Sequence, residues 1–286
     1  MTIIIIYRPS LGAMSSIAEP IFLDENREWR SKATGAGFLG NQKNTYSLEF
    51  AIKSINENSF HKHNILVGID SDMEVPNSFL KEFGNVKIFK SSYVCNETEA
   101  KAHHRSSNVT REMINSLPDD EMICYNWITD LMAIKDWDKY IYEAIEKYGK
   151  EGYVYAPSWI EVIKGLKDDI TFENIWVKWR ERCCHALSFP LADNGIITQS
   201  EIDNYVSIAK GFNNGIIIEN TNDRIYGYYN AICVLNEKAK KNMVKLGYHW
   251  EILFDNNFSL GLGMKKCVVT NSFVIHIDKG AYKEDL

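Results

Sequence analysis

Acidic residues follow two short apolar runs of the sequence, at positions where buried strands would end. The run at 122–128 leads to a lone carboxylate, Asp130, and the run at 64–69 leads to Asp70 and Asp72. In an open α/β sheet, ligands bind outside the carboxyl ends of the strands. Carboxylate oxygens at that place suit a hard divalent cation, which nucleotide diphosphates also bind. This spacing indicates a metal-dependent enzyme that acts on a nucleotide-linked substrate.

The two acidic positions differ in their place along the chain. Asp70 and Asp72 follow the second predicted strand, where a carboxylate can accept hydrogen bonds from a ribose or from the N–H of a base. Asp130 follows a later strand and is the predicted metal ligand that faces the diphosphate. The structural alternative for each is a turn or a helix cap, because aspartate favours both.

Asp136 and Asp138 belong to the same acidic stretch, but we expect them to be structural. They bracket the start of a predicted helix at 137–148. Carboxylates are stabilised at the positive end of a helix, so both residues are assigned to the helix start and not to a metal.

Three residues late in the chain are further candidates. His276 lies at the end of a very apolar run, where a lone histidine is more often a packed core residue than a ligand. Glu251 and Asp255 lie among aromatic residues, and a carboxylate there could act as a general base toward a sugar hydroxyl. A turn capped by Asp255 is the alternative, and the residues alone leave the choice open.

Strands and helices alternate along the first 157 residues. A continuous β-branched run such as 2–7 is typical of a strand that is covered on both faces. The alternating order predicts an α/β fold with a Rossmann-like, mostly parallel central sheet flanked by helices. The predicted strands are 2–7, 64–69, 86–89, 122–128 and 153–157, and the predicted helices are 45–56, 77–83, 100–116 and 137–148.

The rest of the chain has a less regular pattern. Residues 9–44 are predicted to form a long loop, and residues 158–224 a helical insertion. No repeat and no clear linker is visible, so one domain of residues 1–286 is the simplest organisation. The helices expected in this part are 172–184, 200–210 and 237–246, and the strands are 211–219, 224–235 and 266–277.

Composition narrows the class of protein. Of 286 residues, 45% are hydrophobic and 24% charged, which is an ordinary globular balance. The net charge of −6 argues against nonspecific nucleic-acid binding, which needs a basic surface. The 6 cysteines include no CxxC pair, so a reduced, cytoplasmic protein without a zinc site is expected. No apolar run is long enough for a signal peptide or a transmembrane segment.

Taken together, these segments resemble a family 2-like glycosyltransferase with the GT-A fold. Residues 2–8 are similar to its first strand, which ends before the nucleotide loop. Residues 45–72 (TYSLEFAIKSINENSFHKHNILVGIDSD) are similar to its first helix and second strand. Residues 103–130 are similar to the helix and strand that lead to its metal motif.

The later segments extend the resemblance. Residues 127–141 (WITDLMAIKDWDKYI) are similar to an Asp-Asp-Met…Trp-Asp pattern of some branches of the family. Residues 250–258 (WEILFDNNF) are similar to its acceptor-side segment, and His276 to a late histidine that often completes the metal site. The resemblance covers most of 1–157 and 224–277, by order and spacing of the elements.

The resemblance implies transfer of a sugar from a nucleoside-diphosphate sugar, such as a UDP- or GDP-sugar, to a hydroxyl of a saccharide acceptor. Residues 1–157 would form the nucleotide-sugar-binding half and residues 158–286 the acceptor-side half. The residues implied in nucleotide binding are Arg8, Asp70, Asp72 and Asn108.

The resemblance also implies the reacting groups. Asp130, with His276, would hold Mn²⁺ or Mg²⁺ against the diphosphate and stabilise the charge of the leaving group. Asp255 or Glu251 would be the base if the reaction inverts the anomeric carbon, whereas a retaining enzyme would not need one.

Two other functions are compatible with the sequence. A sugar nucleotidyltransferase shares the architecture, but it expects a glycine-rich basic loop directly after the first strand, and the glycines at 35–40 come later without a basic residue between them. A non-catalytic nucleotide- or sugar-binding protein derived from a glycosyltransferase is the other alternative. Its support is that the family's Asp-x-Asp is here Asp130-Leu131-Met132, which lacks one metal carboxylate.

Overall fold

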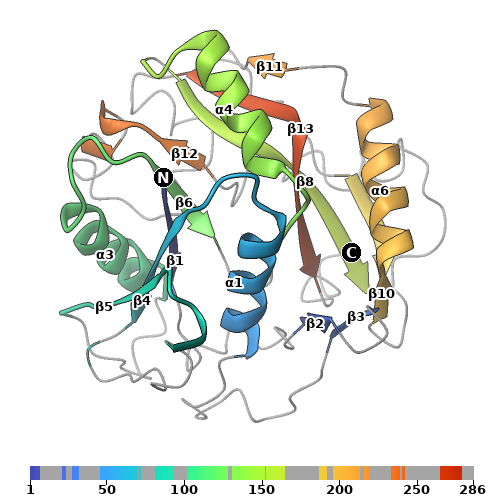
Figure 1. The fold of residues 1–286 in the computed structure, drawn as a ribbon, viewed down its shortest axis with the longest axis horizontal. Helices are drawn as coiled ribbons and strands as arrows, with labels where there is room; N and C mark the ends of the chain where they lie inside the picture. Colours follow the sequence, from blue (N-terminus) through green and yellow to red (C-terminus); the bar gives the residue numbers. More distant parts are fainter. Residues whose placement is uncertain are drawn as a thin grey trace.

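A ten-stranded sheet forms the centre of the computed structural model, and a second sheet has three strands (Figure 1). The structure describes residues 1–6, 21–23, 28–31, 46–69, 71, 81–92, 102–127, 131–151, 153–164, 187–191, 196–212, 216–218, 233–238, 240–241 and 265–278. The predicted helices at 77–83 and 172–184 lie largely or wholly outside these residues.

The central sheet is mixed and mostly parallel, which confirms the predicted fold class. Its order is β11-β13-β8-β12-β6-β1-β4-β5, with β7 paired to β13 and β9 paired to β8. Parallel pairs join β1 to β4 and β6, β4 to β5, and β8 to β9 and β13. The strands are β1 (Thr2–Ile6), β4 (Asn64–Ile69), β5 (Val86–Lys90), β6 (Ile123–Trp127), β7 (Leu131–Ala133), β8 (Tyr153–Lys164), β9 (Leu187–Leu191), β11 (Ile216–Ile218), β12 (Cys233–Leu235) and β13 (Lys265–Asp278).

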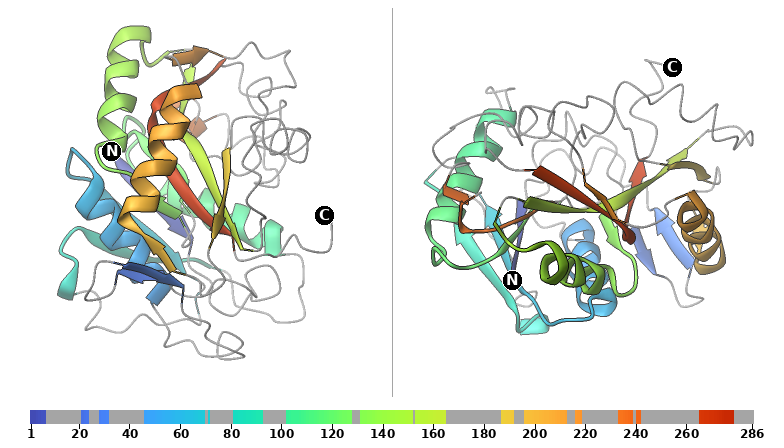
Figure 2. Two further views of the ribbon diagram at one scale, coloured as in Figure 1. Left: turned by 90° about the vertical axis from the view of Figure 1, so that its right-hand side faces the viewer. Right: turned by 90° about the horizontal axis from the view of Figure 1, so that it is seen from above.

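Helices cover both faces of this sheet. Helices α1 (Tyr46–Asn58) and α4 (Trp137–Tyr148) lie on one face, and α3 (Ala102–Asn115) lies on the other (Figure 2). Burial from both sides explains the unbroken apolar run of β1, in which Ile3, Ile4 and Ile5 are fully buried. The buried stripe of α1 has the helical spacing that the sequence predicts, and it consists of Leu48, Ala51, Ile52 and Ile55.

The close packing of α3 on β4 depends on a glycine. A Cβ atom added to Gly68 would lie 2.4 Å from the Met113 Sδ and 2.9 Å from the Val109 Cγ1. Both distances are shorter than atoms can approach, so the helix can reach this depth only where the strand carries no side chain.

The prediction of a loop at 9–44 is wrong in part. Strands β2 (Ile21–Leu23) and β3 (Glu28–Ser31) form the second sheet together with β10 (Ile196–Thr198). In this sheet Trp29 pairs with Ile197, which is far away in the sequence. Local periodicity carries no information on such a partner, so a three-residue strand cannot be distinguished from a loop by pattern alone.

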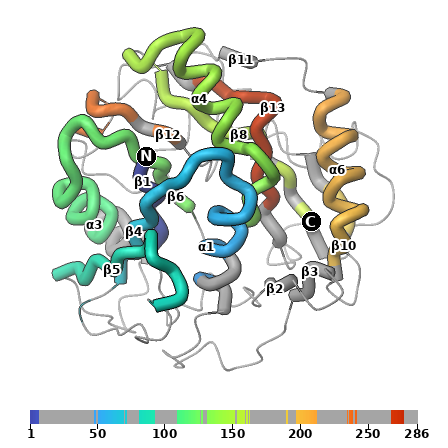
Figure 3. Tube along the Cα trace, viewed as in Figure 1, coloured from blue at the N-terminus to red at the C-terminus, as the bar shows by residue number. Residues whose placement is uncertain are grey.

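The prediction that a strand ends at 157 is also wrong, because β8 continues to Lys164 through Pro157. Strands β8 and β13 run side by side (Figures 1 and 3). Pro157 pairs with Val269, whereas the next residue, Ser158, pairs with Phe273. The irregularity in β13 therefore lies beside the proline, and bulges are where a strand tolerates a residue without an N–H group.

The expected helical insertion contains strands as well as a helix. Helix α6 (Gln199–Phe212) follows β10, and β9 and β11 join the central sheet. Reciprocal hydrogen bonds stabilise the first turn of α6. Thr198 donates its N–H and its hydroxyl to the Glu201 carboxylate at 2.7 and 2.8 Å. In return, the Thr198 Oγ1 accepts a hydrogen bond from the Glu201 N–H at 3.2 Å. This is a capping box. None of the helices in the described part of the chain is long and apolar enough to cross a membrane.

The capping box predicts a loss of stability on truncation. The Glu201→Ala variant should lose about 1 kcal/mol of unfolding free energy, because the Thr198 N–H and hydroxyl lose their acceptor. Urea unfolding measures the change. Asp203→Ala, an exposed acid on the same helix, is the matched control and should change stability by less than about 0.5 kcal/mol; equal losses in the two variants would contradict the capping role.

Candidate functional site at the carboxyl edge of the sheet

The order of the parallel strands creates a switch point beside β1. The chain proceeds from β1 to β4 and β5 on one side, and then returns to place β6 on the other side of β1. Register pairs Ile6 with Gly68 and Ile5 with Trp127, so β1, β4 and β6 end at the same edge of the sheet. In open α/β sheets, ligands bind outside the carboxyl ends of the strands at such a switch point.

The predicted site residues are mostly absent from the part of the chain that the structure describes. Asn108 lies in α3 and His276 in β13, where the structure gives their backbone positions. The predicted residues outside the described ranges are Arg8, Asp70, Asp72, Asp130, Glu251 and Asp255. Their roles therefore stay predictions.

The backbone places residue 276, one of the two predicted metal ligands, beside the residue that follows the other in the sequence. Strand β7 is antiparallel to β13, and its register pairs Leu131 with His276. Leu131 is bonded directly to Asp130 in the sequence. The fold thus places residue 276 opposite the residue that follows Asp130, which the sequence could not show. Among the side chains that the structure describes, no group of three His, Cys, Asp or Glu could hold a metal ion.

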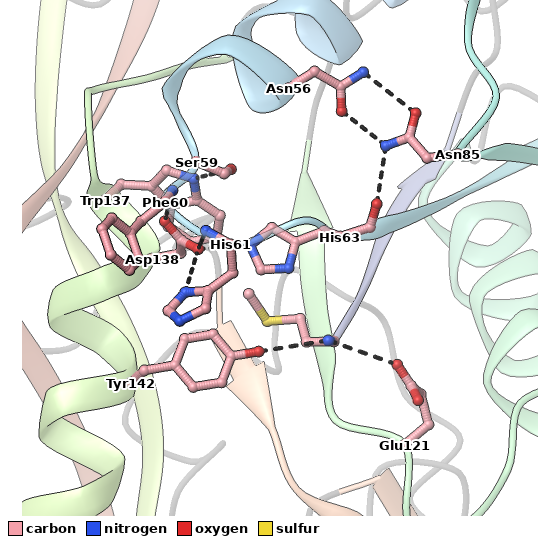
Figure 4. Close-up of polar contacts among 11 residues, drawn as sticks. Asn56, Ser59, Phe60, His61, His63, Asn85, Glu121, Trp137, Asp138 and Tyr142 are labelled. Atoms are coloured by element: carbon pink, nitrogen blue, oxygen red, sulfur yellow. Dashed lines mark hydrogen bonds and ion pairs between the residues drawn. The ribbon is translucent and has the colours of Figure 1, made fainter.

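Asp138, which the sequence assigned to the start of a helix, is fully buried. Its carboxylate accepts hydrogen bonds from the Phe60 and His61 N–H groups at 2.6 and 2.9 Å. It also contacts the His61 Nδ1 at 3.0 Å and the His63 Nε2 at 2.8 Å (Figure 4). Burial alone raises the pKa of Asp138, but the hydrogen bonds from His63, Phe60 and His61 outweigh it and lower the pKa to about 2.

Aromatic side chains enclose this carboxylate. The rings of His63 and Tyr142 are stacked at 6.4 Å, and the indole of Trp137 donates to the Ser59 hydroxyl at 2.9 Å. Burial, with the negative charge of Asp138, raises the pKa of Tyr142. The cluster lies where β4 begins, at the amino edge of the sheet, and the Asp138 and His63 side chains are closed to solvent. We therefore assign it to the stability of the fold and not to the binding of a substrate.

No sequence pattern singled out this cluster. His61 and His63 precede β4, and Asp138 lies more than 70 positions later. The position of Asp138 next to Trp137, among the buried residues of α4, was the one indication that its carboxylate is buried. A carboxylate at a helix start explains the same position equally well.

Asp136 has the predicted position but not the predicted interaction. It is the N-cap residue of α4, yet its side chain makes no capping hydrogen bond. Its backbone is left-handed, with φ of 63°, and its N–H donates to the Asn58 carbonyl at 2.7 Å. The choice of residue at position 136 is therefore limited by the left-handed backbone conformation, which an aspartate adopts more readily than most residues do.

Comparison with known proteins finds no matching protein family and no matching curated protein. Among solved structures, the chain is similar to a crystal structure of GalNAc-T7 with UDP, GalNAc and Mn²⁺. The TM-score is 0.42 at 11% sequence identity, and the match covers 98% of this chain and 44% of that chain. The present chain thus spans less than half of that protein's length. A similarity of this size assigns neither a family nor a function.

The Asp138 cluster predicts a specific pH dependence. The pKa of Asp138 is lower in the folded state than its ordinary value of 3.8, so its contribution to stability is present above about pH 4 and is lost as pH falls toward 2. The shift corresponds to about 2 kcal/mol. The Asp138→Asn variant should be less stable by about 3 kcal/mol at pH 7, because the buried donors lose their charged acceptor.

Denaturant unfolding of both proteins between pH 7 and pH 2 measures this effect. The difference between wild type and Asp138→Asn should shrink below pH 4. Glu143→Gln, which removes an exposed carboxylate from the same helix, is the control and should behave as the wild type does at every pH. A difference that stays constant down to pH 2 would show that the charge of Asp138 contributes nothing.

The left-handed backbone of Asp136 predicts opposite effects of two small residues. Asp136→Gly should be at least as stable as the wild type, because glycine adopts positive φ without strain. Asp136→Ala should be less stable by about 1 kcal/mol, since a Cβ is disfavoured there and alanine cannot hydrogen-bond locally. Thermal melts of the two variants test this, and an alanine variant as stable as the glycine variant would contradict it.

Proposed function

We propose that the chain is a GT-A-like glycosyltransferase, related to the family 2-like enzymes, that moves a sugar from a nucleoside-diphosphate sugar to a hydroxyl of a saccharide acceptor. The observation that carries the proposal is the switch point beside β1. Three strands end there at one edge, and each is followed within three residues by a predicted ligand residue: Arg8 after β1, Asp70 after β4 and Asp130 after β6. This edge is where an α/β sheet binds nucleotides.

The nucleotide would be held by residues that follow β1 and β4. Asp70, with Asp72, would accept hydrogen bonds from the nucleoside, because carboxylates pair with ribose hydroxyls and with the N–H of a pyrimidine or guanine. Arg8 would pair with phosphate oxygens, for which the guanidinium fork is suited. Asn108 would contribute an amide from α3. The donor is accordingly a UDP- or GDP-sugar in this proposal.

Mn²⁺ or Mg²⁺ would be held by Asp130 and His276. The register that pairs Leu131 with His276 supports this set, because it places residue 276 beside the residue that follows Asp130 in the sequence. A carboxylate oxygen and an imidazole nitrogen together suit Mn²⁺, while Mg²⁺ would rely more on the carboxylate and on water. When bound, the cation would neutralise the charge that develops on the departing diphosphate.

The acceptor side would come from the second half of the chain, residues 158–286. Asp255 or Glu251 would remove the proton from the acceptor hydroxyl if the anomeric carbon is inverted. In a retaining reaction neither acid would be needed as a base. The halves share one sheet, because β8, β12 and β13 lie in the same sheet as β1, β4 and β6.

A non-catalytic protein that binds a nucleotide or a sugar is the second candidate. The observation that favours it is the sequence Asp130-Leu131-Met132, which has one carboxylate where the family has two. The structure adds that Leu131 and Met132 are buried in β7, so neither position is open for a ligand.

Turnover of donor sugars distinguishes the glycosyltransferase from the non-catalytic binding protein. UDP-, GDP- and dTDP-sugars are incubated with the protein and Mn²⁺, and the released nucleoside diphosphate is measured. We expect hydrolysis of one donor, abolished by EDTA and reduced at least about 100-fold in Asp130→Ala, because the variant loses a ligand of the cation. Asp120→Ala removes an exposed acid just before β6 and should retain full turnover.

Each other outcome has a defined meaning. Thermal stabilisation by a nucleotide without turnover, also in the presence of a mixture of saccharide acceptors, would favour the binding protein. Turnover that persists in EDTA and in Asp130→Ala would contradict the cation site. Neither turnover nor stabilisation with any donor would overturn the assignment to nucleotide sugars altogether.

A further inference from the structure

Two histidines share the buried carboxylate of Asp138, and they approach it through different ring nitrogens. His61 reaches it with Nδ1 at 3.0 Å, and His63 reaches it with Nε2 at 2.8 Å (Figure 4). The pKa of Asp138 is lowered to about 2, so near pH 7 this carboxylate is ionised and can only accept hydrogen bonds. Each contacting nitrogen must therefore carry the proton that it donates.

The carboxylate thereby fixes opposite tautomers in the two rings. A neutral imidazole has one N–H and one bare nitrogen, so its lone pair lies on Nε2 in His61 and on Nδ1 in His63. The His63 Nδ1 is buried with no hydrogen-bond partner among the described residues, and this side chain is 1% exposed. The side chain of His61 is 41% exposed. Asp138 and His63 therefore serve stability, whereas His61 is the member of the cluster that is open to solvent.

A bare imidazole nitrogen that is open to solvent is a nucleophile. When the His61 Nε2 attacks an electrophile, positive charge develops on the ring, and the Nδ1–H directs that charge toward the Asp138 carboxylate. The Asp138 side chain has no exposed surface, so this attraction is screened less than it would be in water. The same carboxylate fixes the orientation of the ring, as it does for histidines in catalytic triads.

The surroundings of His61 favour an anionic reagent. Lys62 is exposed and follows His61 directly in the sequence. The Lys139 ammonium lies 5.6 Å from the centre of the Phe60 ring, and that ring meets the His61 ring edge-on at 5.0 Å. Lys139 also lies 4.0 Å from the Glu143 carboxylate, in an exposed pair that neutralises it only weakly. A metal ion is not the expected partner, because the described residues offer no group of three ligands.

We propose that His61 is a phosphoryl-acceptor site, a role that goes beyond the proposed function and does not depend on it. The His61 Nε2 attacks the phosphorus of a phosphoramidate-type donor whose nitrogen is fully protonated. A new N–P bond forms, the P–N bond of the donor breaks, and ammonia leaves with the electron pair of that bond. The Nδ1–H stays on the ring, so the product is a phosphorylated imidazolium that is paired with Asp138, and no further reactant is needed.

Potassium phosphoramidate at pH 7 tests this site in the folded protein. Peptide mass spectrometry follows phosphorylation of each histidine, and N-acetylhistidine amide in the same solution gives the reference rate. We expect His61 to react at least about tenfold faster than the reference compound, because its carboxylate stabilises the product. His63 should stay unmodified until urea unfolds the protein, since its lone pair is buried. Reaction of His61 no faster than the reference compound overturns the proposal.

The Asp138→Asn variant separates the charge of the carboxylate from its hydrogen bond. The asparagine carbonyl can still accept from the His61 Nδ1–H, but the negative charge is lost. The rate at His61 should therefore fall to within about twofold of the reference compound. Glu146→Gln, which removes an exposed carboxylate from the same helix, is the matched control and should leave the rate unchanged. Equal rates in Asp138→Asn and the wild type would overturn the role of the carboxylate.

The tautomers are measured in the wild type alone, so this part of the test stands even if Asp138→Asn does not fold. Long-range ¹H–¹⁵N NMR spectra at pH 8, where histidines are ordinarily neutral, distinguish protonated from bare ring nitrogens. His61 should show a protonated Nδ1 and a bare Nε2, and His63 should show the reverse. The opposite tautomer in His61 places a proton on the attacking nitrogen and rejects the proposal, whatever the outcome of the donor-sugar assay.

Discussion

Moving a carboxylate from water into a protein interior costs several kcal/mol unless its oxygens are paired. Asp138 meets this condition with four contacts, and all of them come from residues 60–63. The loop between α1 and β4 must therefore close over the start of α4 whenever the chain is folded. Because the charge cannot return to water without opening the core, this contact fixes three elements, α1, β4 and α4, relative to one another.

Strand β7 connects these contacts to the opposite edge of the sheet. The turn between β7 and α4 is tied to the end of α1, and Ser54 holds β7 itself from one helical turn earlier. Contacts at the amino edge of the sheet, where no ligand is expected, thus help to fix the position of β7. This strand begins directly after Asp130, a predicted ligand. The Asp138 contacts and the proposed binding site lie at different edges of the sheet, so the edge of the proposed site can keep polar residues that would weaken a core.

Some elements have the bounds that the sequence predicts and others do not, and the difference has physical reasons. The strand at 64–69 and the helix at 137–148 have the predicted bounds, because their apolar spacing reflects burial within each segment. The strand through Pro157 was missed, since the neighbouring irregularity in β13 that accommodates the proline lies over 100 residues away. Strands β2 and β3 were missed because they are short and because β3 pairs with β10, which belongs to the second half of the chain.

For the candidate site, the sequence by itself determined which residue types follow the apolar runs, and hence that acids follow two of the predicted strands. Hydrophobic periodicity and the acid positions are local properties, which a chain carries before it folds. Only the tertiary structure decided that Leu131 faces His276, that Asp138 is a buried anchor and not a helix cap, and that Ser54 closes the edge of β7. Those facts depend on pairing between segments far apart in the chain, and pairing is fixed by the packing of the whole core.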